Sequence, residues 1–231
     1  MALDLSAVAE QVAGTAPFRG ITPEDTVAML RCMRARVRAY DADEAILRMG
    51  DTTSAFGLVL AGGIRIERTD AWGAVSVLGF VRPGEVFGES YACAPGTPLL
   101  VNAIAAEPTR TLLLDVGAVL SVCDKSCPYH AKLISNLLTI SARKNIELSR
   151  RAFHTSPKSI RGKLLSYLST EAARARSRSF SIPYNRQQLA DYLGVDRCAL
   201  SSELTRMQRD GLLRTRRCAF ELLTDDGADE L

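Results

Sequence analysis

The first 33 residues alternate apolar and polar positions at helical spacing. Ala7, Val8 and Val12 mark one short helix, and Thr22 followed by Pro23 predicts the start of a second, because threonine caps a helix and proline suits its first turn. From about residue 34, glycine-containing turns divide the chain into short β-prone runs, which are typical of an antiparallel barrel or sandwich. The predicted strands cover residues 34–40, 45–48, 55–61, 63–69, 74–80, 86–87, 101–106 and 111–115.

The pattern becomes helical again after Cys127 and Pro128. We expect one long helix over residues 129–153, because proline suits its first turn and nothing in the run breaks a helix. Its apolar stripe has near-heptad spacing, which suits packing against another helix. A hinge is then expected at Thr155-Ser156-Pro157, with Ser156 capping the next helix and Pro157 opening it, and a basic polar loop over residues 173–181.

Residues 185–213 have the spacing of a helix-turn-helix motif. Asn185 caps a first helix, and Gln188 stands three residues on, as in a capping box. Gly194 provides the positive φ that a tight turn between helices requires, and Asp196 caps a second helix. The apolar positions that we expect to pack between the helices are Leu189, Ala190, Leu193, Leu200, Leu204 and Met207.

A basic β-hairpin, or wing, is predicted after this motif, from the β-prone residues 212–215 and 219–223 that flank Arg216-Arg217. In a helix-turn-helix motif the second helix enters the major groove with its N-terminal residues, and the start of the first helix can hold a phosphate. The candidate DNA-binding residues are Arg186, Gln187, Arg197, Cys198, Ser201, Ser202 and Arg206. The alternative interpretation is a helical hairpin with a solvated basic face.

Charge is distributed unevenly along the 231 residues, whose net charge is +3. Residues 1–149 carry 14 Lys and Arg against 16 Asp and Glu, residues 150–217 carry 15 against 5, and residues 218–231 carry none against 5. The basic stretch indicates a polyanion-binding module. No apolar run approaches the roughly 18 residues of a membrane-spanning helix, and the N-terminus lacks the layout of a signal peptide. We therefore expect a cytoplasmic protein with no membrane partner.

Six scattered cysteines without a CxxC pair argue against a disulfide framework and against a common type of metal site. Cys123 and Cys127 form the only close pair, and His130 follows three residues later. Ordinary reduced thiols are the default, while a redox-sensing pair and a metal cluster are the alternatives. His130 and His154 are the only histidines, which argues against histidine-based metal catalysis and a Ser-His-Asp hydrolase. We expect no enzyme activity, no catalytic residues and no metal.

A β-rich domain, a long helix, a hinge and a winged helix-turn-helix, in this order, resemble the Crp/Fnr family of bacterial transcription regulators. The residues that carry the resemblance are Arg186-Gln187, Arg197, residues 60–66 and the run Arg82-Pro83-Gly84-Glu85-Val86-Phe87-Gly88-Glu89. It implies an α+β fold: an N-terminal antiparallel β-roll of the double-stranded β-helix or jelly-roll type over residues 1–127, a dimerisation helix over 128–154, and a winged helix-turn-helix DNA-binding domain over 155–231. The resemblance also implies a homodimer that binds a palindromic promoter site, responds to a small-molecule or redox signal, and has RNA polymerase as a further partner.

The chain departs from the cyclic-nucleotide-binding relatives in its expected effector pocket. In those relatives the glutamate that matches Glu89 is followed by an arginine that pairs with the cyclic phosphate. Residues 88–109 contain no Arg or Lys here, and a buried phosphate without a positive partner is very unfavourable. We therefore expect no binding of cyclic AMP in the usual mode, and the effector and any cofactor stay unknown. The candidate effector-binding residues are Gly88, Glu89, Val101, Asn102, Lys144 and Asn145.

Other departures concern the signal and the DNA site. Oxygen-sensing relatives carry an N-terminal cysteine cluster, whereas Cys32 is the only cysteine in this N-terminal third, so an iron–sulfur centre is not expected. A haem held through Cys127-Pro128 is a minor alternative. Cys198 stands where many relatives have glutamate. We therefore do not expect this chain to recognise the DNA half-site that those relatives bind.

Two functions of other classes stay open as alternatives. One is a protein-interaction adaptor that uses the β-roll and has only vestigial DNA binding. The other is a cupin-like enzyme, which would need several histidines on its strands, whereas both histidines lie outside the predicted strands.

Overall fold

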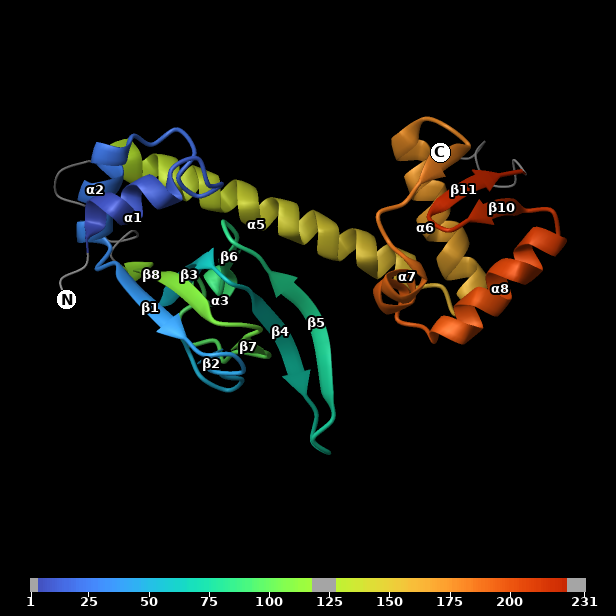
Figure 1. Cartoon of the computed structure of the whole chain (residues 1–231), viewed down its shortest axis with the longest axis horizontal. Helices are drawn as coiled ribbons and strands as arrows, with labels where there is room; N and C mark the ends of the chain where they lie inside the picture. The colour runs from blue at the N-terminus through green and yellow to red at the C-terminus, as the bar shows by residue number, and fades with distance from the viewer. Residues whose placement is uncertain (1–3, 118–127, 224–231) are drawn as a thin grey trace. The chain divides into compact units, whose positions relative to one another are not determined.

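The computed structural model describes residues 4–117 and 128–223 (Figure 1). The chain forms two compact units, Met1–Arg143 and Lys144–Leu231, and the division between them lies within the long helix α5 (Pro128–Thr155). Each unit is described here by itself. The division after residues 127 and 154 into three functional parts stays a prediction.

Two short helices open the first unit. α1 (Leu5–Val12) is capped by Asp4, whose carboxylate accepts hydrogen bonds from two backbone N–H groups of its first turn. α2 (Pro23–Cys32) begins at the predicted cap, since the Thr22 hydroxyl accepts from the N–H of Asp25. Both helices bury their apolar faces in the core of this unit.

The predicted strands are confirmed in this unit, with ends that differ by at most two residues. They are β1 (Arg36–Tyr40), β2 (Ala45–Leu47), β3 (Ala55–Ala61), β4 (Ile64–Thr69), β5 (Val75–Val81), β6 (Val86–Phe87), β7 (Asn102–Ala105) and β8 (Thr109–Asp115). All their pairings are antiparallel, in two four-stranded sheets of order β1-β8-β3-β6 and β2-β7-β4-β5. The short helix α3 (Glu89–Ala92) follows β6.

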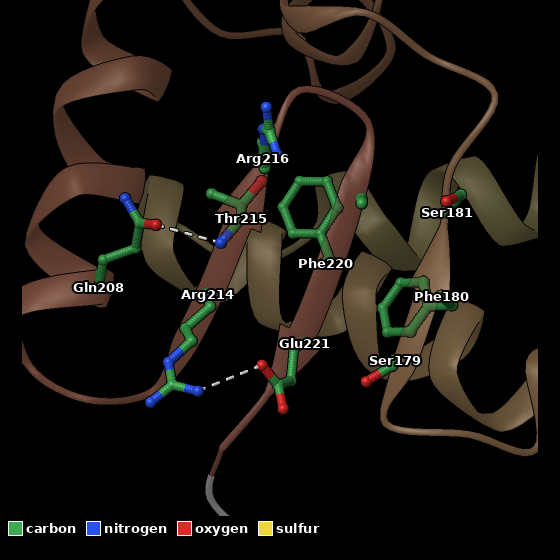
Figure 2. Close-up of a pocket in the computed structure, with 10 residues that line it drawn as sticks. Ser179, Phe180, Ser181, Gln208, Arg214, Thr215, Arg216, Phe220 and Glu221 are labelled. Carbon is green, nitrogen blue, oxygen red and sulfur yellow. Dashed lines mark hydrogen bonds and ion pairs between the residues drawn. The ribbon is translucent and has the colours of Figure 1, made fainter.

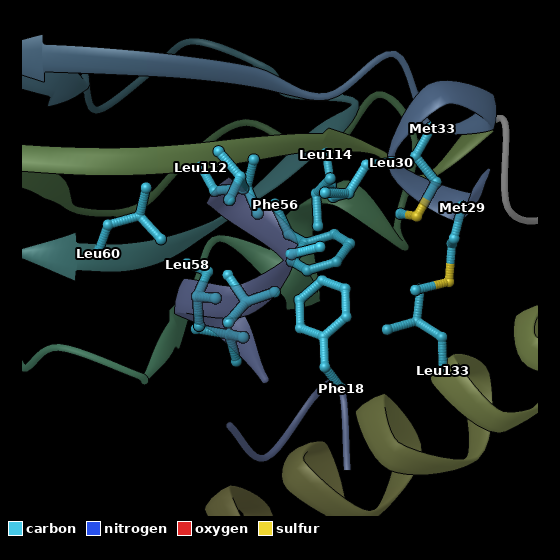
Figure 3. Packing of buried hydrophobic residues seen from close by; sticks show 14 of the residues in the cluster. Phe18, Met29, Leu30, Met33, Phe56, Leu58, Leu60, Leu112, Leu114 and Leu133 are labelled. Atoms are coloured by element: carbon cyan, nitrogen blue, oxygen red, sulfur yellow. The ribbon is translucent and has the colours of Figure 1, made fainter. Parts of the chain in front are cut away.

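Two apolar clusters stabilise the β-roll. The larger one joins α1, α2 and the start of α5 to one sheet, with the Phe18 and Phe56 rings near its centre and Leu133 of α5 at its edge (Figure 3). The smaller one takes side chains from both sheets and includes Val59, Ile64, Phe87 and Ala103. Apolar side chains therefore fill the space between the two sheets.

The predicted start of the helix after α5 is wrong. The Ser156 N–H donates to Ala152 O and the Ser156 hydroxyl donates to Phe153 O, so this residue ends α5 and does not cap its successor. α6 (Ile160–Ala175) is capped instead by Ser159, whose hydroxyl accepts from the backbone N–H two residues into the helix. The predicted loop over residues 173–181 is also partly wrong, because α6 reaches Ala175 and β9 (Ser179–Ser181) follows.

The helix-turn-helix motif and the wing are confirmed. They consist of α7 (Arg186–Leu193), α8 (Arg197–Arg209), β10 (Leu213–Arg216) and β11 (Ala219–Leu222), and β9 completes a three-stranded sheet of order β10-β11-β9. All six apolar positions predicted to pack between the helices are buried in one cluster with Leu164, Tyr167 and Leu168 of α6. With the β-roll, these elements give the predicted α+β fold.

Candidate functional site

The turn between α7 and α8 is built from the residues that the sequence singled out. Asn185 and Gln188 form a reciprocal capping box, with both hydrogen bonds at 2.9 Å. Gly194 adopts φ +62°, the left-handed conformation that a residue with a side chain rarely takes. Asp196 then caps α8 by accepting from Ala199 N at 2.8 Å. Because each helix end is satisfied locally, the start of α8 has a defined direction.

Most of the side chains predicted to read DNA lie on the exposed side of α8. Arg197, Cys198, Ser202 and Arg206 are exposed, and Ser201 is half-buried. Residues four apart on a helix lie on one side of it, so the five side chains form two neighbouring rows, 197–201 and 198–202–206. The opposite side of α8 is buried in the core. The structure thus brings these five candidates together on one surface.

The two candidates at the start of α7 have different environments. Gln187 is exposed, and its amide donates to Asp191 Oδ1 at 2.8 Å. Arg186 is half-buried: its guanidinium donates to Thr215 Oγ1 at 2.8 Å and lies over the Phe220 ring, 5.1 Å from the centroid. Desolvation by burial lowers the pKa of Arg186. The Arg186 side chain therefore ties α7 to the wing.

The wing adds two arginines that lie outside the candidate residues predicted from the sequence. Arg214 and Arg216 project from β10 and line an open hollow of about 650 Å³, with Ser179 and Ser181 of β9 on the same side (Figure 2). Glu221 lies 3.6 Å from Arg214 and offsets part of its charge. Alternation along a strand places every second residue on one face, which is the sequence signal that could have identified them.

Four of the six effector candidates belong to the first unit. Gly88 takes φ +74° at the start of α3, and Glu89 is buried with 5% of its surface exposed. Val101 directly precedes β7 and Asn102 is its first residue, whose Oδ1 accepts from Met49 N at 2.8 Å. Tyr91 joins α3 to this segment by accepting a hydrogen bond at its hydroxyl from Leu100 N, at 3.3 Å.

The two remaining effector candidates belong to the second unit. Lys144 and Asn145 are exposed on α5, and Asn145 Oδ1 accepts from the Ser149 hydroxyl at 3.3 Å. In the first unit, Arg65 of β4 is already engaged, since its guanidinium lies 2.7 Å from Glu67 and 3.1 Å from Asp43.

Cys123 and Cys127 lie outside the described residues, and His130 is buried with 6% exposed. Within the described residues, no group of three metal-ligating side chains gathers. Burial, and secondarily the charge of Glu89, raises the pKa of the Cys93 thiol.

Comparison with known proteins identifies the family. Residues 37–126 match the model of the cyclic nucleotide-binding domain, and residues 162–225 match that of the Crp-like helix-turn-helix domain. The chain is 27% identical over 202 residues to the cyclic AMP receptor protein of Thermus thermophilus, covering 87% of this chain and 89% of that protein. It is also 27% identical over 183 residues to the transcriptional activator protein FnrA of Stutzerimonas stutzeri, covering 77% and 72%.

The chain belongs to the Crp/Fnr family. As a Crp/Fnr protein it is a DNA-binding transcription regulator and not an enzyme. The solved structure of DNR from Pseudomonas aeruginosa has the same fold, with a TM-score of 0.50, 18% identity, and coverage of 98% of this chain and 97% of that one. Among the described residues of this Crp/Fnr protein, no helix is long and apolar enough to cross a membrane.

Proposed function

We propose that this Crp/Fnr regulator binds a palindromic DNA site as a homodimer, in the cytoplasm, and that a signal other than cyclic AMP controls it through the β-roll. The observation that carries the proposal is the exposed side of α8, where Arg197 and four further polar side chains stand at the helix start or in its next turns. Arginine can bond guanine through two donors, and serine can bond bases or phosphates. RNA polymerase is the further partner expected for such a regulator.

The wing and the first helix of the motif would act on the phosphate backbone. Arg214 and Arg216 are exposed on β10, and Gln187 is exposed at the start of α7, where helix N–H groups point outward. Contacts of this kind fix the position of a protein on DNA without reading its sequence. Arg186 would contribute indirectly, by fixing the wing against α7.

Exposed apolar side chains on α5 support the homodimer. Leu138, Ile146, Leu148 and Phe153 are 69%, 53%, 69% and 70% exposed, although α5 is otherwise a polar helix. A helix that exposes large apolar side chains over several turns is suited to packing against another helix. A second copy of α5 presents the same apolar side chains, so an interface with two-fold symmetry would cover those of both helices.

The interior of the β-roll argues against an anionic nucleotide as the signal. Val59, Ile64, Phe87 and Ala103 occupy the space between the sheets, and residues 88–109 contain no positive side chain. A phosphate placed there would lose its hydration without gaining a charged partner. A neutral or apolar signal fits these surroundings better.

Selection of DNA from a random library by the full-length protein, followed by a gel-shift assay, tests the proposal. The expected result is a palindromic consensus that is bound preferentially at moderate salt and by two protein chains per duplex. Binding without sequence preference would contradict the proposal and favour the interaction adaptor. One chain per duplex would contradict the homodimer.

A further inference from the structure

The last turn of α5 is fastened to the first helix of the helix-turn-helix motif. Arg151 donates from Nε to Tyr192 O and from Nη2 to Asp191 O, both at 3.0 Å. These carbonyls belong to the C-terminal turn of α7, where carbonyl groups lack α-helical partners and a nearby cation is favourable. Lys163 of α6 donates to the next carbonyl, Leu193 O, at 3.1 Å. The end of α7 is therefore held by cations from two other helices.

His154, one turn after Arg151, makes a second link to the same residue of α7. Its Nδ1 lies 2.9 Å from the Tyr192 hydroxyl and its Nε2 lies 3.1 Å from the Thr170 hydroxyl of α6. The imidazole is 4% exposed and also packs edge-on against the Tyr167 ring. We call the contacts of Arg151 and His154 with α7 the α5–α7 clasp.

The neutral imidazole satisfies every hydrogen bond of the clasp on His154. The Thr170 hydroxyl donates its single proton to Ser166 O at 2.9 Å, so it must accept from His154 Nε2–H. In the neutral imidazole the Nδ1 atom then carries no proton and accepts from the Tyr192 hydroxyl. Burial, with the nearby charge of Glu147, raises the pKa of Tyr192 to about 12, so this hydroxyl keeps its proton at any ordinary pH. A second proton would turn Nδ1 into a donor, so the Tyr192 hydroxyl would have to rotate and its O–H would lose its acceptor on His154.

A cavity of about 170 Å³ gives solvent access to this site. It is lined by His154, by tyrosines and by charged side chains, and a volume of this size can hold water. The titratable and charged groups that face it, besides His154, are Glu147 and Arg150 from α5, Tyr167, Glu171 and Arg174 from α6, Tyr184 from the segment before α7, and Tyr192 from α7. Arg151 lies nearby, over the Tyr192 ring. Protons can therefore reach the imidazole without unfolding of the motif.

We propose that protonation of His154 opens the α5–α7 clasp and thereby lowers the affinity of this regulator for its DNA site. His154 and Arg151 are positioning residues in this proposal, because they act on DNA through the placement of α7 and α8. The inference rests on the proposed function, in which α8 reads the DNA. It goes beyond that function by adding a proton-sensitive connection between α5 and the motif.

The direction of the effect follows from the burial of the imidazole. Desolvation lowers the pKa of His154 below its ordinary value of 6.5, while the charges of Glu171 and Glu147 partly oppose this shift. An exposed imidazole in the open clasp would titrate near 6.5. The open form therefore binds protons more readily. The free-energy preference for the clasped form is greatest above about pH 6.5 and decreases as the pH falls below that value.

The test is the affinity of the full-length protein for its selected DNA between pH 8.0 and pH 5.5. For each protomer of the dimer, the wild type should lose up to about tenfold more affinity per pH unit below pH 6.5 than His154→Gln, which keeps an amide donor for Thr170 and does not titrate. The matched control is His130→Gln, because His130 is the only other histidine in the chain. That variant should follow the wild-type pH profile.

Equal pH profiles for the wild type and His154→Gln would overturn the clasp. Absence of sequence-specific binding at pH 8.0 would overturn the proposed function instead, so the two failures are distinguishable. Tyr192→Phe provides a second test if His154→Gln does not fold. Removal of the hydroxyl should raise the pKa of His154, measured by NMR of the ring, and move the midpoint of the affinity profile to higher pH; an unmoved midpoint would contradict the clasp.

Discussion

Gly57 of β3 lies directly against the ring of Phe87 of β6, so closely that a Cβ atom at position 57 would overlap the ring. The two residues are paired in the sheet, and Phe87 is 3% exposed in the interior of the β-roll. The glycine therefore allows a large aromatic side chain to occupy space between the sheets.

Gly57→Ala should destabilise the protein by about 1–3 kcal/mol, because the added methyl group overfills a packed core. The free energy of unfolding from urea titration measures this. The control is Gly79→Ala in β5, where an added Cβ meets no atom within 4 Å. That change should leave the stability unaltered or raise it by less than about 1 kcal/mol. Equal losses in both variants would show that Phe87 is not the cause.

Asn185→Ala should destabilise the DNA-binding unit by about 0.5–2 kcal/mol, because it removes the side-chain half of the capping box at the start of α7. Thermal unfolding followed by circular dichroism provides the measurement. Asn185→Ser retains a capping oxygen, so this variant should lose much less stability. If the serine variant is as unstable as the alanine variant, the cap does not account for the loss.

Arg197→Ala should weaken binding of the selected DNA site by about 1–3 kcal/mol and relax the sequence preference at one position of each half-site. Arg197 is exposed at the first position of α8. Arg209→Ala is the matched control, since Arg209 is an exposed arginine at the other end of the same helix. A gel-shift assay against mutated half-sites distinguishes the two variants. Unchanged affinity and sequence preference in Arg197→Ala would disprove the role of Arg197 as a base contact.

Cyclic AMP should not bind with measurable heat in titration calorimetry and should not raise the melting temperature. The reason is the lack of a positive side chain in residues 88–109 and the apolar filling between the sheets. A protein of the family that does bind cyclic AMP is the appropriate positive control. A micromolar binding isotherm for this chain would refute the expectation.

Most of the fold follows from local sequence signals. Turn glycines delimit the strands, and Asn185, Gly194 and Asp196 delimit the helices of the motif, because caps and left-handed turns depend on residues close in sequence. Local sequence does not determine the start of α6, because Ser156 and Ser159 are equally good caps in isolation. What decides between them is that α5 continues to Thr155 and uses Ser156 at its own end.

The long-range part of the site could not be predicted from local patterns. Arg186 suits a phosphate at a helix start, but in the structure it contacts Thr215, 29 residues away. Arg151 contacts Tyr192, 41 residues away, and neither position carries a recognisable motif. Such contacts depend on how the helices and the wing pack together, which a one-dimensional pattern of capping and periodicity does not contain.

The contact of Arg151 with the carbonyls of α7 determines where this regulator can be divided and recombined. A hybrid protein that joins a foreign sensor to this motif at residue 158 would leave the Asp191 and Tyr192 carbonyls without their arginine. A junction at residue 144 would retain the last turns of α5 together with the motif they hold. The portable DNA-binding module of this protein therefore includes the end of the helix that precedes it.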